Sequence, residues 1–181
     1  MNKKISLVLA IVFCALLLYA GAAQAGLRRE SMVEYFDKIG PVAVYIPLIV
    51  NTSSDSNVDL EGLKNEIEKA LKNRISHTFN IAASEADADI VIDINVTGYY
   101  WTEEDPVDMI ISPLAAAVDK AKDENYARME MNVVITEAAT GRVLWRKEVQ
   151  STITDDTMTK EASYGMSNER IAKNFVKELF R

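Results

Sequence analysis

Two groups of acidic residues come closest, by residue type and spacing, to a site that could do chemistry. The first group stands in one acidic stretch: Glu103, Glu104, Asp105 and Asp108. Their carboxylates could bind calcium, but the stretch has neither the ligand spacing nor the glycine of a calcium loop. We interpret it as part of a solvated loop.

The second acidic group, Glu85, Asp87 and Asp89, alternates along the chain just before an apolar run. In an extended chain the three carboxylates would point the same way. A glycosidase needs two carboxyl groups held in a cleft, and spacing alone does not show a cleft. We interpret this group as the charged entrance to a strand, and a carboxylate-based hydrolase remains the less favoured alternative.

Other reactive groups are scarce. His77 is the only histidine and Cys14 the only cysteine, so a zinc site is not expected. No serine is surrounded by the residues of a nucleophile elbow. Gly141 stands in a turn without the further residues of a phosphate-binding loop. The sequence therefore predicts a protein that is not an enzyme and that uses no metal ion and no cofactor.

The most interesting cluster is aromatic and apolar. Its members are Tyr99, Tyr100, Trp101, Met109, Ile110, Ile111 and Leu114. Exposed together, they would form a binding patch for a partner protein or a lipid-like ligand. Packing in the core is the alternative. The stretch 102–125 is long for a connection within a small domain, which favours a functional loop, with Trp101 and Ile110 as anchors.

The first 25 residues have the organisation of a secretory signal. Two lysines precede an uncharged apolar run over residues 5–20, and Ala23-Gln24-Ala25 offers small residues where a signal peptidase cleaves. We predict a signal peptide at 1–25 and a mature chain from Gly26. An uncleaved anchor is the alternative, but the run is shorter than the roughly 20 residues that span a bilayer. Phe13 before Cys14 does not suit lipidation of that cysteine.

The mature chain, 26–181, has the size of one domain with a sizeable core. Cleavage would remove two of the 20 basic residues and none of the 27 acidic ones, which leaves a net charge of −9. Such a charge argues against nucleic acid as a partner. The mature chain would have no cysteine, so burial rather than disulfide bonding must stabilise it, and it would have no stable transmembrane segment.

Five stretches have the pattern of strands. Residues 42–50 are nearly all apolar, which is typical of a strand buried on both faces, with a bulge or an edge at Pro47. A short strand is expected at 79–82. From Ile90 to Val96 apolar and other residues alternate, and Tyr99 to Trp101 complete that strand. Two more strands, 127–136 and 143–154, are expected to pair antiparallel around the turn at 139–141.

Two stretches have the pattern of amphipathic helices. The first is expected over 59–77, capped by Asp59 or Asn57, with His77 at its end. Its apolar face comprises Leu60, Leu63, Ile67, Leu71 and Ile75. The second helix is expected to begin at Ser167 as its cap, after a polar linker at 155–165. Its buried side comprises Ile171, Phe175, Val176 and Leu179. Residues 26–40 are interpreted as a charged lead-in.

Among the predicted elements, strands outnumber helices, and the last two strands follow each other directly along the chain. The sequence therefore predicts an α+β domain with a mixed or antiparallel sheet of four to five strands and two helices packed on one face.

Three short motifs also carry a resemblance to a known group of proteins. They are Val42-Ala43-Val44, Ala88-Asp89-Ile90 and Thr140-Gly141-Arg142-Val143-Leu144-Trp145. With the helix from Asp59 between the first two, this order resembles small bacterial envelope domains of the lipopolysaccharide-assembly (LptE-like), transport-auxiliary and curli-secretion lipoprotein type. Those proteins usually start with a lipidated cysteine, which the mature chain lacks. The resemblance implies a sheet with two helices on one face and a non-enzymatic role, and it assigns no binding residue.

The expected function is that of a non-catalytic periplasmic accessory protein in cell-envelope assembly or transport. It would have a contact surface for an envelope protein or a lipid-like ligand, and association with the outer membrane is compatible with this role. A soluble carrier of a small apolar ligand is the alternative, and it requires a cavity beneath the aromatic cluster.

Overall fold

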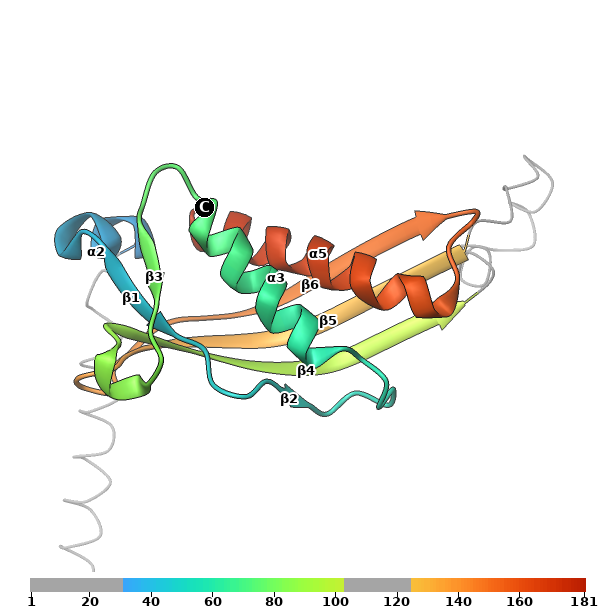
Figure 1. Ribbon diagram of the computed structural model, residues 1–181, viewed down its shortest axis with the longest axis horizontal. Coiled ribbons are helices and arrows are strands. Elements are labelled where there is room, and N and C mark those ends of the chain that lie inside the picture. Colours follow the sequence, from blue (N-terminus) through green and yellow to red (C-terminus); the bar gives the residue numbers. More distant parts are fainter. Residues whose placement is uncertain (1–30, 103–124) are drawn as a thin grey trace, which may run out of the picture. The chain divides into compact units, whose positions relative to one another are not determined.

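The core of the fold is a mixed β-sheet with two helices on one of its faces (Figure 1). The computed structural model describes residues 31–102 and 125–181. The six strands of this part of the chain have the order β3-β1-β4-β5-β6, and β2 pairs with β4. Their bounds are β1 Val42–Tyr45, β2 Val50–Asn51, β3 Phe79–Ile81, β4 Ile90–Thr102, β5 Asn125–Glu137 and β6 Val143–Asp155.

Strands β4 and β5 confirm the predicted alternation, and β6 is the predicted antiparallel partner of β5. β4 pairs antiparallel with β5, and β5 with β6. The buried side chains of β4 and β5 include Ile90, Ile92, Ile94, Val96, Ala127, Met129, Met131, Val133 and Ile135. Between β5 and β6 the chain turns at Gly141, whose φ of 68° suits a glycine. The hairpin predicted around residues 139–141 is therefore confirmed.

A bulge in β4 changes which of its side chains face the helices. The register with β5 shifts between Val96 and Gly98, and as a result both Val96 and Tyr99 are buried. The ring of Tyr100 lies across Gly98, where a Cβ atom would come within 2.8 Å of Tyr100 Cε2. Glycine at this position lets the tyrosine ring cover the strand.

The predicted strand at 42–50 is wrong in its extent. β1 and β2 are separate, and Pro47 lies between them, because proline cannot donate a ladder hydrogen bond. β1 lies parallel between β3 and β4, and β2 is parallel to β4. Val42 and Val44 are buried while Ala43 and Tyr45 are half-buried, so the strand is not equally buried on both faces.

Helix α3, Leu60–Lys72, has the predicted cap but ends earlier than predicted. Asp59 accepts a hydrogen bond from the Gly62 amide at 2.8 Å. The buried side chains of α3 are Leu63, Ile67 and Leu71. The Arg74 amide donates to Leu71 O in a tight last turn, and beyond it Ile75 is fully exposed. The prediction that Ile75 belongs to the buried face and that His77 ends the helix is therefore wrong.

Helix α5, Lys160–Leu179, begins before the predicted cap at Ser167. Thr159 is its cap and accepts a hydrogen bond from the Ala162 amide at 3.2 Å. Ser167 lies inside the helix and is buried, as are Ser163 and Asn168. Because these three buried residues are polar, the sequence shows no apolar periodicity over the first part of the helix. Its predicted apolar members are all buried, as expected: Ile171, Phe175, Val176 and Leu179.

The interpretation of residues 26–40 as a lead-in overlooked helix α2, Met32–Ile39. At eight residues, the helix is too short for its apolar positions to stand out as a repeat. It ends at Ile39, and the following Gly40 has a φ of 75° and donates its amide to Phe36 O at 3.0 Å. Phe36 is buried and its ring contacts those of His77, Phe79 and Phe180. His77 therefore belongs to an aromatic cluster rather than to a helix end.

The predicted α+β class is confirmed, with α3 and α5 packed on one face of the sheet (Figure 1). The sheet is mixed, because β1, β2 and β3 form parallel pairs. It has more strands than the predicted four to five, since the stretch 42–50 contributes two. Across residues 31–102 and 125–181, no helix is long and apolar enough to cross a membrane.

Candidate functional site

The end of the sheet at which β4 finishes holds three of the predicted binding residues. Tyr99 is buried, Trp101 is half-buried and Tyr100 is 52% exposed. Tyr100 lies on the face opposite to Tyr99, so the three side chains do not form one continuous patch. The other predicted members, Met109, Ile110, Ile111 and Leu114, lie outside the described residues.

These aromatic residues line an open hollow of about 520 Å³. Its other lining residues come from a loop and from the start of α5: Ser54, Asp55, Ser56, Asn57 and Lys160. We call this the aromatic-end hollow. No sequence pattern indicates its polar side, because Asp55 lies in a predicted turn and Lys160 in a predicted polar linker.

Asp55 is the centre of the polar side. Its Oδ2 accepts hydrogen bonds from the Tyr164 hydroxyl and from Lys160 Nζ, both at 3.0 Å. Its Oδ1 accepts from the Asn57 amide at 2.9 Å. Burial favours the neutral acid, but the Asn57, Lys160 and Tyr164 donors outweigh it and lower the pKa of Asp55 below its usual value.

The neighbouring tyrosines are held in their neutral form. Burial raises the pKa of Tyr99, and burial together with the hydrogen bond to Asp55 raises the pKa of Tyr164. The Asp55 carboxylate raises the pKa of Lys160 in turn. The two tyrosine rings pack with centroids 4.9 Å apart. Each of these groups keeps its ordinary charge near neutral pH, so the cluster is suited to binding rather than to proton transfer.

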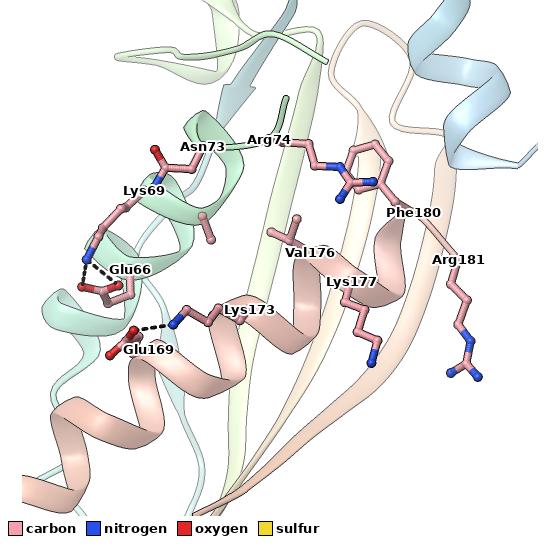
Figure 2. A pocket seen from close by; sticks show the side chains of 11 residues that line it. Glu66, Lys69, Asn73, Arg74, Glu169, Lys173, Val176, Lys177, Phe180 and Arg181 are labelled. Atoms are coloured by element: carbon pink, nitrogen blue, oxygen red, sulfur yellow. Dashed lines mark hydrogen bonds and ion pairs between the residues drawn. The ribbon is translucent and has the colours of Figure 1, made fainter. Parts of the chain in front are cut away.

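A second hollow, of about 600 Å³, lies between α3 and α5 (Figure 2). We call it the helix groove. Its lining residues are Glu66, Lys69, Ala70, Asn73, Arg74, Glu169, Lys173, Val176, Lys177, Phe180 and Arg181. The sequence suggested only solvated helix faces here, since nothing in it shows that α3 and α5 lie next to each other.

The helix groove has neutral and cationic parts. Lys69 pairs with Glu66 at 3.0 Å and Lys173 with Glu169 at 2.5 Å, shown as dashed lines in Figure 2. At the other part, the guanidinium of Arg74 lies 4.4 Å from the centre of the Phe180 ring. The groove therefore combines an excess of positive charge with an aromatic surface.

The acidic residues considered for catalysis have structural roles where they are described. Glu85 and Asp87 belong to a single 3₁₀ turn, Glu85–Asp87, rather than to an extended strand. Asp87 accepts from the Ser84 hydroxyl at 2.7 Å, and Asp89 Oδ2 accepts from the Ala43 amide at 2.7 Å. The stretch with Glu103 to Asp108 lies outside the described residues. Within residues 31–102 and 125–181, no three His, Cys, Asp or Glu side chains are arranged to hold a metal ion.

Comparison with known proteins shows likeness in structure only. No protein-family model and no curated protein matches this sequence. The fold is similar to that of the hypothetical protein CT253 from Chlamydia trachomatis, with a TM-score of 0.51, 7% identity and coverage of 78% of this chain and 96% of that one.

Two bacterial proteins show weaker similarity. Lipoprotein GNA1162 from Neisseria meningitidis has a TM-score of 0.43 and 13% identity, over 76% of this chain and 99% of that one. PelC from Paraburkholderia phytofirmans, solved as a dodecamer, has a TM-score of 0.42 and 13% identity, over 75% and 87%. At such identities the likeness concerns the fold alone.

Proposed function

We propose that the protein is a non-catalytic accessory factor of the bacterial cell envelope, exported by the signal at residues 1–25, and that it binds a partner protein at the aromatic-end hollow. The observation that carries the binding role is the pairing, at one end of the sheet, of accessible aromatic side chains with a fixed polar cluster. Tyr100 and Trp101, from the two faces at the end of β4, supply the aromatic side chains, and Asp55 and Lys160 supply the polar side.

The end of β4 that carries these aromatic side chains is held firmly. Tyr99 is buried beneath it and contacts both Ser163 and Tyr164 of α5. The ladder between β4 and β5 continues to the pair Thr102 and Tyr126. Aromatic side chains presented by a rigid element lose little conformational entropy on binding, which is why such residues often dominate interface energies.

The alternative of a carrier for a small apolar ligand has less support. It needs an apolar cavity beneath the aromatic residues, whereas the hollow there is open and lined largely by polar side chains. Tyr99 fills the space below it.

Site-specific photo-crosslinking in cells tests the binding role. A photoreactive amino acid would replace Tyr100 in one variant and Val143 in another. The two side chains are equally accessible, at 52% and 51%, and Val143 pairs near the opposite end of the sheet. We expect a discrete crosslinked protein from position 100 only, and a lower yield when Trp101→Ser is added. Equal patterns from both positions would contradict the proposal.

Export is tested separately by mass spectrometry of the protein from a periplasmic extract. We expect a chain that starts at Gly26. A chain retaining residues 1–25, or one starting at a lipidated Cys14, would overturn this part of the proposal while leaving the binding role open to the crosslinking result.

A further inference from the structure

The helix groove has a charge opposite to that of the protein as a whole. The chain has a net charge of −7, yet the groove is lined by five cationic side chains and two carboxylates. The cations are Lys69, Arg74, Lys173, Lys177 and Arg181. A cationic hollow on an acidic protein concentrates anions locally, because neighbouring charges of one sign reinforce each other's field.

The excess charge is confined to one part of the groove. The two lining carboxylates are engaged by Lys69 and Lys173. Among the described residues, no carboxylate pairs with Arg74 or Lys177. Arg181 has only a shared partner, since Glu178 also pairs with Lys147. Arg74 and Lys177 are therefore available to an anion, and the charge of Arg181 is only partly neutralised.

Arg74 is held in position before any ligand arrives. Its guanidinium lies on the Phe180 ring, and its Nε donates to Ser76 Oγ at 3.1 Å. The terminal nitrogens of Arg74 have no protein partner among the described residues, and Arg74 lines the groove. An arginine fixed by stacking loses less entropy on forming two parallel hydrogen bonds, the geometry in which guanidinium binds phosphate oxygens.

The remaining surface of the groove suits an organic group attached to the anion. Ala70 lines the groove, and Val176 and the Phe180 ring lie among its charged side chains (Figure 2), so all three offer apolar contacts. A volume of about 600 Å³ lies in the range of small-molecule sites.

We propose that the helix groove is a binding site for a phosphate ester, with the phosphate group held at Arg74, the charge of Lys177 adding to the attraction, and the organic portion lying against Ala70, Val176 and Phe180. This site is separate from the aromatic-end hollow and does not depend on the function proposed for it.

Calorimetric titration of the purified protein tests the site with three probes. They are inorganic phosphate, dihexanoyl phosphatidic acid below its micelle concentration, and dihexanoyl phosphatidylcholine as the lipid without net charge. We expect phosphatidic acid to bind and phosphatidylcholine to bind at least tenfold more weakly. Binding of inorganic phosphate at the same site, shown by competition, identifies soluble phosphates as a source. Its failure to bind identifies the lipid headgroup, and both results support the site.

Charge-matched variants locate the binding. Each lost cation is expected to weaken binding roughly fivefold, so the double variant Arg74→Gln, Lys177→Gln should weaken it by more than about tenfold. The double variant Arg146→Gln, Arg170→Gln removes the same two charges from exposed positions outside the groove and should change nothing. Equal losses in both, or no binding of either phosphate probe, would overturn the proposal.

Stability separates binding from a purely structural role. Cations near the ends of α3 and α5 also stabilise the helix dipoles. Lys177 is exposed and without a partner among the described residues, so Lys177→Gln should leave the melting temperature within a few degrees of the unaltered protein while weakening phosphatidic acid binding. A lower melting temperature with unchanged binding would show that the cations serve the helices alone.

Discussion

The hydroxyl groups of Tyr99 on β4 and Ser163 on α5 form a buried hydrogen bond. Ser163 donates its own proton to Lys160 O at 2.5 Å, so the tyrosine is the donor and the serine the acceptor. This bond joins the aromatic end of the sheet to the first turn of the helix that covers it.

Tyr99→Phe should therefore lower the free energy of unfolding by about 0.5–1.5 kcal/mol, the usual net value of one hydrogen bond. Urea denaturation would measure it. In a double-mutant cycle with Ser163→Ala, the combined loss should be smaller than the two single losses added together. Strict additivity would mean that the bond contributes nothing to stability.

Ile92→Ala should lower the free energy of unfolding by roughly 2–5 kcal/mol, because Ile92 is fully buried between the sheet and the helices. Asp93→Ala should change it by little, since Asp93 is exposed on the other face. Denaturant titration of the two variants compares them directly. Similar losses at both positions would contradict the burial pattern of β4.

The two glycines inside the helices should respond differently to alanine. At Gly165 in α5 an added Cβ meets nothing within 4 Å, so Gly165→Ala should stabilise the protein by about 1 kcal/mol through helix propensity. At Gly62 the Cβ would lie 2.1 Å from Asp59 Oδ2. Gly62→Ala displaces that cap, which costs about 0.5–2 kcal/mol and removes the gain. A stabilisation at Gly62 equal to that at Gly165 would show that the cap is unimportant.

The stability contributed by Asp55 should depend on pH. Because its pKa is lower in the folded than in the unfolded state, its contribution is complete above the unfolded value of about 4 and is lost as the pH falls through the folded value. Asp55→Asn should therefore lower the melting temperature at pH 7, and the difference from the unaltered protein should shrink below about pH 4. A difference that stays constant down to pH 2.5 would exclude this linkage. The melting temperatures measured below pH 4 are therefore the ones that test the linkage.

The candidate sites were only partly predictable from the sequence. The aromatic residues Tyr99 to Trp101 stand out by type, but the bulge before Gly98 decides that Tyr99 rather than Tyr100 faces the helices. The bulge depends on how β4 pairs with β5, and the local sequence does not show this pairing. The helix groove could not be predicted either, because its cations come from two helices that lie about a hundred residues apart in the chain.

The sequence by itself determined the α+β class, the long β4-β5-β6 succession and the buried faces of α3 and the later part of α5. Periodic apolar patterns of that length favour one element strongly. Only the tertiary structure decided where α3 and α5 begin or end, that 42–50 makes two strands, and that α2 exists. There the pattern is short or interrupted by buried serines, and long-range contacts such as those of Phe36 and Ser163 outweigh local preference.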